Sequence, residues 1–149
     1  MWEAPAIRNR TSVGLDVHAR SVVGCTIDEE TGEVHRRRLS PDNRVIEAWV
    51  RELPRPRRVT YEAGPTGFGL ARHLLGVGIE TVVAAPSKLQ RPTGDRVKTD
   101  ARDALHLARL LKLGEIVEVT IPSVEQEAAP ARDLVRARED ARGDLSRLD

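Results

Sequence analysis

Apolar and polar positions along the chain follow two different periods. Two β-branched runs, 12–18 and 21–27, are separated by a short polar break, and a Glu-Glu-Thr-Gly turn leads into a third run at 34–39. Short β-branched runs bounded by turn residues are typical of strands. The first part of the chain is therefore predicted to form an antiparallel meander of three strands.

After residue 40 the pattern alternates between helix and strand. The expected elements are a helix between Pro41 and Pro54, a strand at 57–63, a helix around 70–75, a strand at 80–85, a helix from Thr99 to Gly114, and a short apolar connection at 116–121. This order combines an antiparallel meander with right-handed crossover units. It predicts an α/β, ribonuclease-H-like (RuvC-like) fold, with a mixed five-stranded sheet flanked by helices.

The 149 residues fit one domain with flanking segments. We expect an N-terminal extension at 1–11, the folded domain at 12–122, and at 123–149 the beginning of a helical segment. Leucine and alanine near heptad spacing in this last segment favour a helix that pairs with a partner. It is therefore the expected surface for a homo-oligomer, a dimer or a tetramer.

Composition limits the cellular setting and the partners. The net charge is +1, from 24 basic and 23 acidic residues, so nucleic-acid affinity would require local clusters of Lys and Arg. Cys25 is the only cysteine and cannot form an intramolecular disulfide. No run is long and apolar enough to span a bilayer, and no signal-peptide pattern opens the chain. We expect a cytoplasmic protein with no membrane partner.

Four carboxylates form the candidate site. Asp16 interrupts an apolar strand, Glu62 ends another, and Asp100 and Asp103 lie three residues apart on one helix. In this topology the first and fourth strands are neighbours, so the four acids are expected to converge, and Mg²⁺ or Mn²⁺ would relieve their repulsion. Two ions about 4 Å apart could then support phosphoryl transfer on nucleic acid.

Each acid also has a simpler explanation. Asp16 could face solvent on a half-exposed strand, and Glu62 could be an ordinary surface residue at a strand end. Asp100 and Asp103 could merely favour the helix dipole. His18 follows Asp16 closely, but a single histidine there is interpreted as a surface or hydrogen-bonding group.

Basic residues gather in three places. The strongest candidate for nucleic-acid contact is an expected loop that leads into the last helix, with Lys88, Arg91, Arg96, Lys98 and Arg102. Two further clusters are 36–38 and the arginines between 51 and 58. Each could contact phosphates, although a solvated face is the favoured explanation for any single cluster.

Three motifs carry a resemblance to a known family. The segments Gly-Leu-Asp-Val-His at 14–18, Tyr-Glu-Ala-Gly-Pro-Thr-Gly at 61–67 and Lys-Thr-Asp-Ala-Arg-Asp-Ala at 98–104 resemble the DEDD transposases of bacterial insertion sequences and the pilin-gene invertases. The resemblance implies a RuvC-like fold, Mg²⁺ dependence, and a tetrad of Asp16, Glu62, Asp100 and Asp103 that serves DNA strand exchange. It also implies a homo-oligomer and, from members guided by a bridge RNA, a structured guide RNA.

The resemblance leaves two alternatives open. Family members continue into a second domain with a nucleophilic serine, whereas this sequence stops at Asp149, so we expect no complete recombination by this chain alone. A truncated, non-catalytic regulator or remnant that binds nucleic acid is one alternative. An actin-like or sugar-kinase ATPase fragment is the other, although it requires a duplicated fold and glycine-rich phosphate loops and would leave Asp100 and Asp103 without a role.

Overall fold

A computed structural model describes residues 10–86 and 96–129, with side chains from Asp100 onwards in the second range. The elements are β1 (Thr11–Val17), β2 (Val22–Asp28), β3 (Val34–Leu39), α1 (Asn43–Arg51), β4 (Arg57–Glu62), α2 (Gly69–Gly76), β5 (Glu80–Ala84), α3 (Arg96–Leu113) and β6 (Glu118–Val119). They build one sheet in the order β3-β2-β1-β4-β5-β6. The meander β1-β2-β3 is antiparallel, β1, β4 and β5 are parallel, and β6 is antiparallel to β5.

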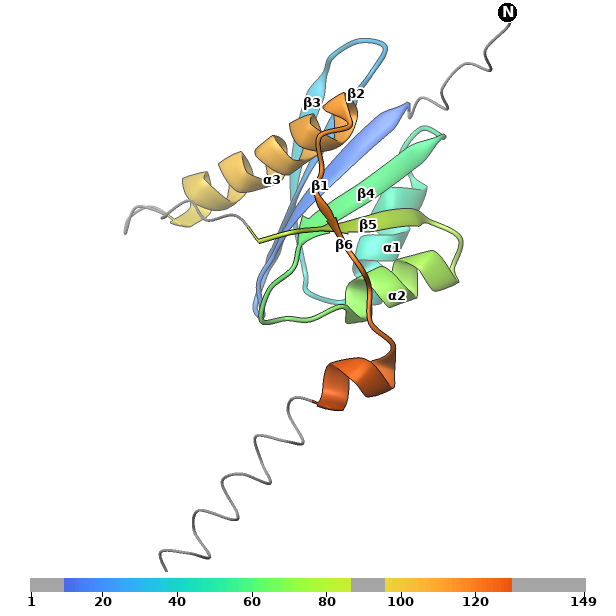
Figure 1. Cartoon of the computed structure of the whole chain (residues 1–149). Helices are drawn as coiled ribbons and strands as arrows, with labels where there is room; N and C mark the ends of the chain where they lie inside the picture. The colour runs from blue at the N-terminus through green and yellow to red at the C-terminus, as the bar shows by residue number, and fades with distance from the viewer. Residues whose placement is uncertain (1–9, 87–95, 130–149) are drawn as a thin grey trace, which may run out of the picture.

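Helices cover both faces of the sheet. The long helix α3 lies over β1, β2 and β4, and α1 and α2 lie on the opposite face (Figure 1). The larger core cluster joins α1 and α2 to the sheet through residues such as Leu15, Trp49 and Tyr61, and a smaller cluster lies under α3. The mixed α/β fold with the ribonuclease-H-like order of its first five strands is therefore confirmed.

The strand count and the predicted start of the last helix were wrong. A sixth strand, β6, falls in the segment predicted as a connection, where Val119 pairs with Val83 and gives the edge of β5 a partner. A two-residue strand is too short to show alternation in sequence. In addition, α3 begins at Arg96, so Arg96 and Lys98 are helical and not in a loop, consistent with the good helix propensity of Arg and Lys.

A glycine lets α3 approach the central strand. A Cβ on Gly14 would lie 2.1 Å from the carbonyl oxygen of Ala104 and 2.6 Å from the backbone nitrogen of Ala108. Only hydrogen at this position allows the backbone of α3 to pack directly on β1. Because side chains alternate along a strand, Asp16 faces α3 like Gly14, whereas Leu15 faces the opposite core.

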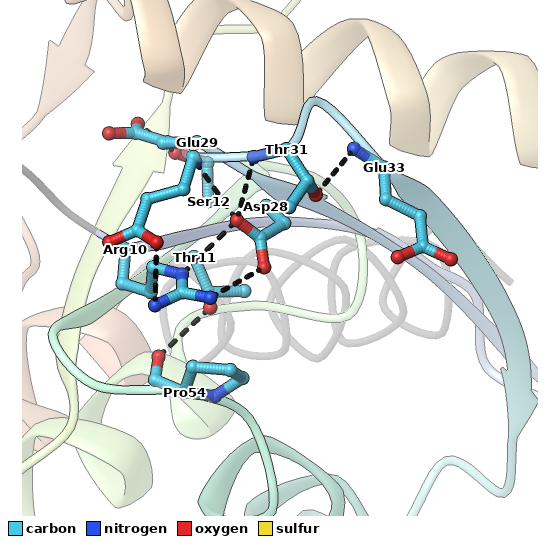
Figure 2. A network of polar contacts seen from close by, with 9 residues as sticks. Arg10, Thr11, Ser12, Asp28, Glu29, Thr31, Glu33 and Pro54 are labelled. Carbon is cyan, nitrogen blue, oxygen red and sulfur yellow. Dashed lines mark hydrogen bonds and ion pairs between the residues drawn. The ribbon is translucent and has the colours of Figure 1, made fainter.

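A polar network closes the end of the sheet where β1 begins (Figure 2). Arg10 donates two hydrogen bonds to Asp28, at 3.1 and 3.2 Å, and the backbone nitrogens of Glu30 and Thr31 donate to the same carboxylate. The hydroxyl of Ser12 donates to Glu29. These contacts fix the turn between β2 and β3 at the end of the sheet opposite to Asp16. Within the described residues, no helix is long and apolar enough to cross a membrane.

Candidate metal centre

Asp16 is a buried carboxylate near the carboxyl end of β1. Asp16 lies beneath α3, and 6% of its surface is exposed. Loss of hydration disfavours a buried charge. Burial accordingly raises the pKa of Asp16 to about 6, opposed by the hydrogen bond and charge of His18 and reinforced by the neighbouring Asp100. The site therefore contains a carboxylate whose charged form a bound cation would stabilise.

Two further side chains meet Asp16 across the junction of β1 and α3. The Nε2 atom of His18 lies 2.9 Å from an Asp16 carboxylate oxygen and 3.3 Å from an Asp100 oxygen. One potential ligand atom from each of the three residues lies within 4.8 Å of the others. Two carboxylate oxygens and one imidazole nitrogen are a donor set that suits a divalent metal ion. The residues present thus fit a bound cation.

Sequence reasoning did not assign His18 to the site. His18 immediately follows β1, and its backbone nitrogen donates a hydrogen bond to the Ser21 carbonyl across the β1–β2 turn. The spacing Asp-x-His was an available signal, because residues two apart in extended chain project to the same side. The spacing could not show that Asp100 would close the group from a helix more than 80 residues away.

Glu62 and Asp103 lie around this group without joining it. Leu15 pairs with Tyr61 in the parallel β1–β4 register, so Asp16 and Glu62 are the next residues on adjacent strands and share the face toward α3. Asp103 follows Asp100 by about one helical turn and is half-buried. Among the described residues, the set of ligand atoms within 4.8 Å comprises Asp16, His18 and Asp100.

The turn after Glu62 is held by hydrogen bonds from two directions. The Tyr61 hydroxyl donates to the Gly67 carbonyl at 3.3 Å and accepts from the Ala71 nitrogen at 3.1 Å. Glu127, from the last described segment, accepts from the Phe68 nitrogen at 3.0 Å. These bonds restrain the turn and thereby the strand end that carries Glu62.

The predicted nucleic-acid contacts fall in three classes. Lys88 and Arg91 lie outside the described residues. Arg96 and Lys98 belong to the first turn of α3, where the structure describes the backbone alone. Arg102 is exposed on α3, two residues after Asp100. Arg102 is therefore the one of the five whose side chain the structure describes. It is exposed and lies on the same helix as Asp100.

Comparison with known proteins gave consistent matches. The family model for DEDD transposases of the IS110 type matches residues 13–149. The transposase for insertion sequence element IS1533 of Leptospira borgpetersenii is 33% identical over 146 residues, covering 95% of this chain and 42% of that protein. The putative transposase y4qE of Sinorhizobium fredii is 56% identical over 81 residues, covering 54% of this chain and 20% of that protein. The chain thus spans less than half the length of these curated relatives.

A solved structure also matches. The large terminase nuclease from the thermophilic phage G20c, crystallised with bound zinc, aligns with a TM-score of 0.43 and 17% sequence identity. The alignment covers 72% of this chain and 61% of that chain.

Proposed function

Because the chain belongs to the DEDD transposase family of the IS110 type, we propose that it carries the metal-binding site for Mg²⁺- or Mn²⁺-dependent phosphoryl transfer on DNA during transposition of an insertion sequence. The observation that carries this proposal is the group of Asp16, His18 and Asp100 beneath the first half of α3. A buried carboxyl group that has a raised pKa and lies beside other carboxyl groups is typical of functional sites.

The roles of the side chains follow from where they lie. Asp16 and Asp100 would hold the cation, with Glu62 on the adjacent strand and Asp103 one helical turn further completing the acidic set. When bound, Mg²⁺ or Mn²⁺ supplies Lewis-acid polarisation of a phosphodiester and stabilises negative charge on its oxygens. Burial of Asp16 limits its orientation and excludes water from one side of the carboxylate. His18 can donate to Asp16 or Asp100 and so orient either carboxylate.

The partners of the whole protein are part of the same proposal. DNA is the substrate that the family implies, and Lys88, Arg91, Arg96, Lys98 and Arg102 are proposed to contact it. A structured guide RNA and a homo-oligomer formed through 123–149 extend the proposal to the assembly. Strand transfer is proposed to require, in addition to this metal site, the nucleophilic serine that family members carry in a second domain.

Calorimetric titration with Mn²⁺ and with Mg²⁺ tests the metal site. Wild type should bind, and Asp16→Asn or Asp100→Asn should weaken binding at least about tenfold because each removes a charged ligand. Glu62→Gln should weaken it less if Glu62 completes the site only with DNA present. Glu33→Gln is the matched control, because this exposed carboxylate lies in the β2–β3 region at the other end of the sheet (Figure 2).

The same titration defines the role of His18. If its nitrogen coordinates the cation, His18→Asn should weaken Mn²⁺ binding more than Mg²⁺ binding, because imidazole suits transition metals better than Mg²⁺. Equal small effects on both cations would leave His18 as an orienting group. Wild-type affinity in the Asp16 and Asp100 variants would contradict the proposed site, and absence of binding by wild type would favour a non-catalytic nucleic-acid-binding protein.

A further inference from the structure

Strand β3 carries three consecutive arginines at the outer edge of the sheet. Arg36, Arg37 and Arg38 are all exposed. Successive side chains on a strand point to opposite faces, so Arg36 and Arg38 share one face and Arg37 takes the other. The run therefore divides its charge unequally between the two faces of the sheet.

The strand register identifies the face that Arg36 and Arg38 share. Arg38 pairs with Val23, and Val23 pairs with Asp16, so the three residues form one row across β3, β2 and β1. Paired residues lie on the same face, and neighbouring strands are about 4.8 Å apart. The Cα atoms of Arg38 and Asp16, two strands apart, are therefore separated by about 10 Å, and both side chains lie on the face that carries the metal centre. Arg36 begins the parallel row, through Cys25 to Gly14.

Independent contacts agree with this assignment. The Cys25 sulfur lies 3.5 Å from the Ala101 carbonyl of α3, so Cys25 faces that helix. Burial raises the pKa of the Cys25 thiol, and the charge of Arg36 opposes the shift, which places the guanidinium beside that thiol. On the opposite face, a Cβ on Gly24, the partner of Arg37, would meet the Trp49 ring of α1.

These arginines have no carboxylate partner within the part of the chain that the structure describes. An exposed arginine without an internal ion pair can bind an external anion without first breaking a contact. The acids at Asp16 and Asp100 repel a polyanion, so a nucleic acid that reaches them needs attraction from nearby cations. Arg36 and Arg38 lie where that attraction would act on the same face.

We propose that Arg36 and Arg38 form a phosphate-binding edge that holds the DNA backbone as it runs from β3 across β2 to the metal centre. The two side chains are spaced about 7 Å apart along the strand and present forked donors suited to phosphate oxygens. The contacts are to the backbone and so are independent of base sequence. This inference rests on the proposed function, because it takes DNA as the substrate.

Fluorescence anisotropy with a labelled DNA duplex, over a series of salt concentrations, tests the proposal. The Arg36→Gln/Arg38→Gln double variant should bind about tenfold more weakly, equally for unrelated sequences. The slope of log K against log salt should shrink by about 2, because each lost phosphate contact releases about one fewer counterion.

The opposite face supplies a charge-matched control. Arg37→Gln/Arg44→Gln also removes two positive charges, but Arg37 faces α1 and Arg44 is an exposed residue of that helix. This control should keep the wild-type salt slope. Both double variants should retain wild-type Mn²⁺ affinity, which shows that the metal centre is intact.

Three results would overturn the proposal. Unchanged affinity and slope in Arg36→Gln/Arg38→Gln would remove these residues from the DNA surface while leaving the proposed function standing. Equal losses of DNA affinity in both double variants would show that the effect comes from overall charge and not from the position of Arg36 and Arg38. Failure of wild type to bind DNA at all would contradict the proposed function itself, and this inference with it.

Discussion

At the carboxyl end of β1, the Asp16 carboxylate lies where its charge is poorly hydrated. A buried unpaired charge costs several kcal/mol, so such a group becomes protonated or acquires a cationic partner. Here His18 contacts the carboxylate at 2.9 Å, and Asp100 adds a like charge nearby. At the residue scale, the carboxylates of Asp16 and Asp100 repel each other in a poorly hydrated site, and a bound divalent cation would offset this repulsion.

Asp16 should make the metal-free protein less stable as pH rises. Its pKa is about 6 in the folded protein, against an ordinary value of 3.8 that the unfolded chain would show. Folding therefore takes up a proton between these pH values, so the free energy of unfolding should fall as pH rises through this window. Urea denaturation in chelator at several pH values would measure it.

The Asp16→Asn variant isolates this effect. Its stability should lack the fall across the same pH window, because asparagine does not titrate, whereas all other groups stay in place. Parallel pH profiles for the variant and wild type would show that Asp16 titrates normally. Saturating Mn²⁺ should also flatten the wild-type profile, since the cation stabilises the ionised carboxylate.

At the scale of elements, the metal centre depends on how closely α3 packs on β1. Ala104 and Ala108 are fully buried on the helix side, and Gly14 is their counterpart on the strand. Three small residues at one crossing bring the two backbones together. The crossing determines where Asp100, four residues before Ala104, lies relative to Asp16.

Gly14→Ala should therefore destabilise the fold and separate the ligands. A Cβ 2.1 Å from a backbone carbonyl forces the helix away, at a cost of about 2–4 kcal/mol. Thermal and urea unfolding would measure the loss, and Mn²⁺ affinity should fall with it. Gly76→Ala is the matched control, because nothing lies within 4 Å of a Cβ there; it should be neutral or slightly stabilising. Equal stability of both variants would refute the close-packing explanation.

At the scale of the whole molecule, contacts distant in sequence tie the last described segment back to the domain. Residues 124–129 are helical, and Ser123 and Gln126 exchange reciprocal hydrogen bonds at the helix start. Glu127 forms an ion pair with Arg72 and accepts from Phe68 at the start of α2, which lacks a side-chain cap of its own. The segment that follows the sheet is thus docked beside the turn after Glu62.

Loss of this docking should loosen the segment without unfolding the core. In Glu127→Ala, amide hydrogen exchange in 120–129 and at the start of α2 should accelerate about tenfold, with exchange in β1 and β4 unchanged. Glu125→Ala is the matched control, because Glu125 is an exposed carboxylate in the same short helix. Equal acceleration in both variants would show that Glu127 does not hold the segment.

The sequence alone determined the order of the elements, and it placed Asp16 and Asp100 among the candidate ligands but not His18. Alternation and helical spacing are local properties, so β1 to β5 and α1 to α3 were predicted in the right order, and handedness rules then limited the topology. Asp16 stood out because a carboxylate interrupts an apolar strand. The two-residue β6 and the first turn of α3 escaped prediction because they are too short, or too polar, to show a period.

Only the tertiary structure decided which side chains meet. The approach of Asp100 to Asp16 depends on the packing of α3 on Gly14, and the inclusion of His18 depends on that same crossing. The assignment of Arg36 and Arg38, and not Arg37, to the face of the metal centre required the strand register, because a shift of one residue exchanges the two faces. Periodicity describes one element at a time, whereas a site arises from contacts between elements that are distant in sequence.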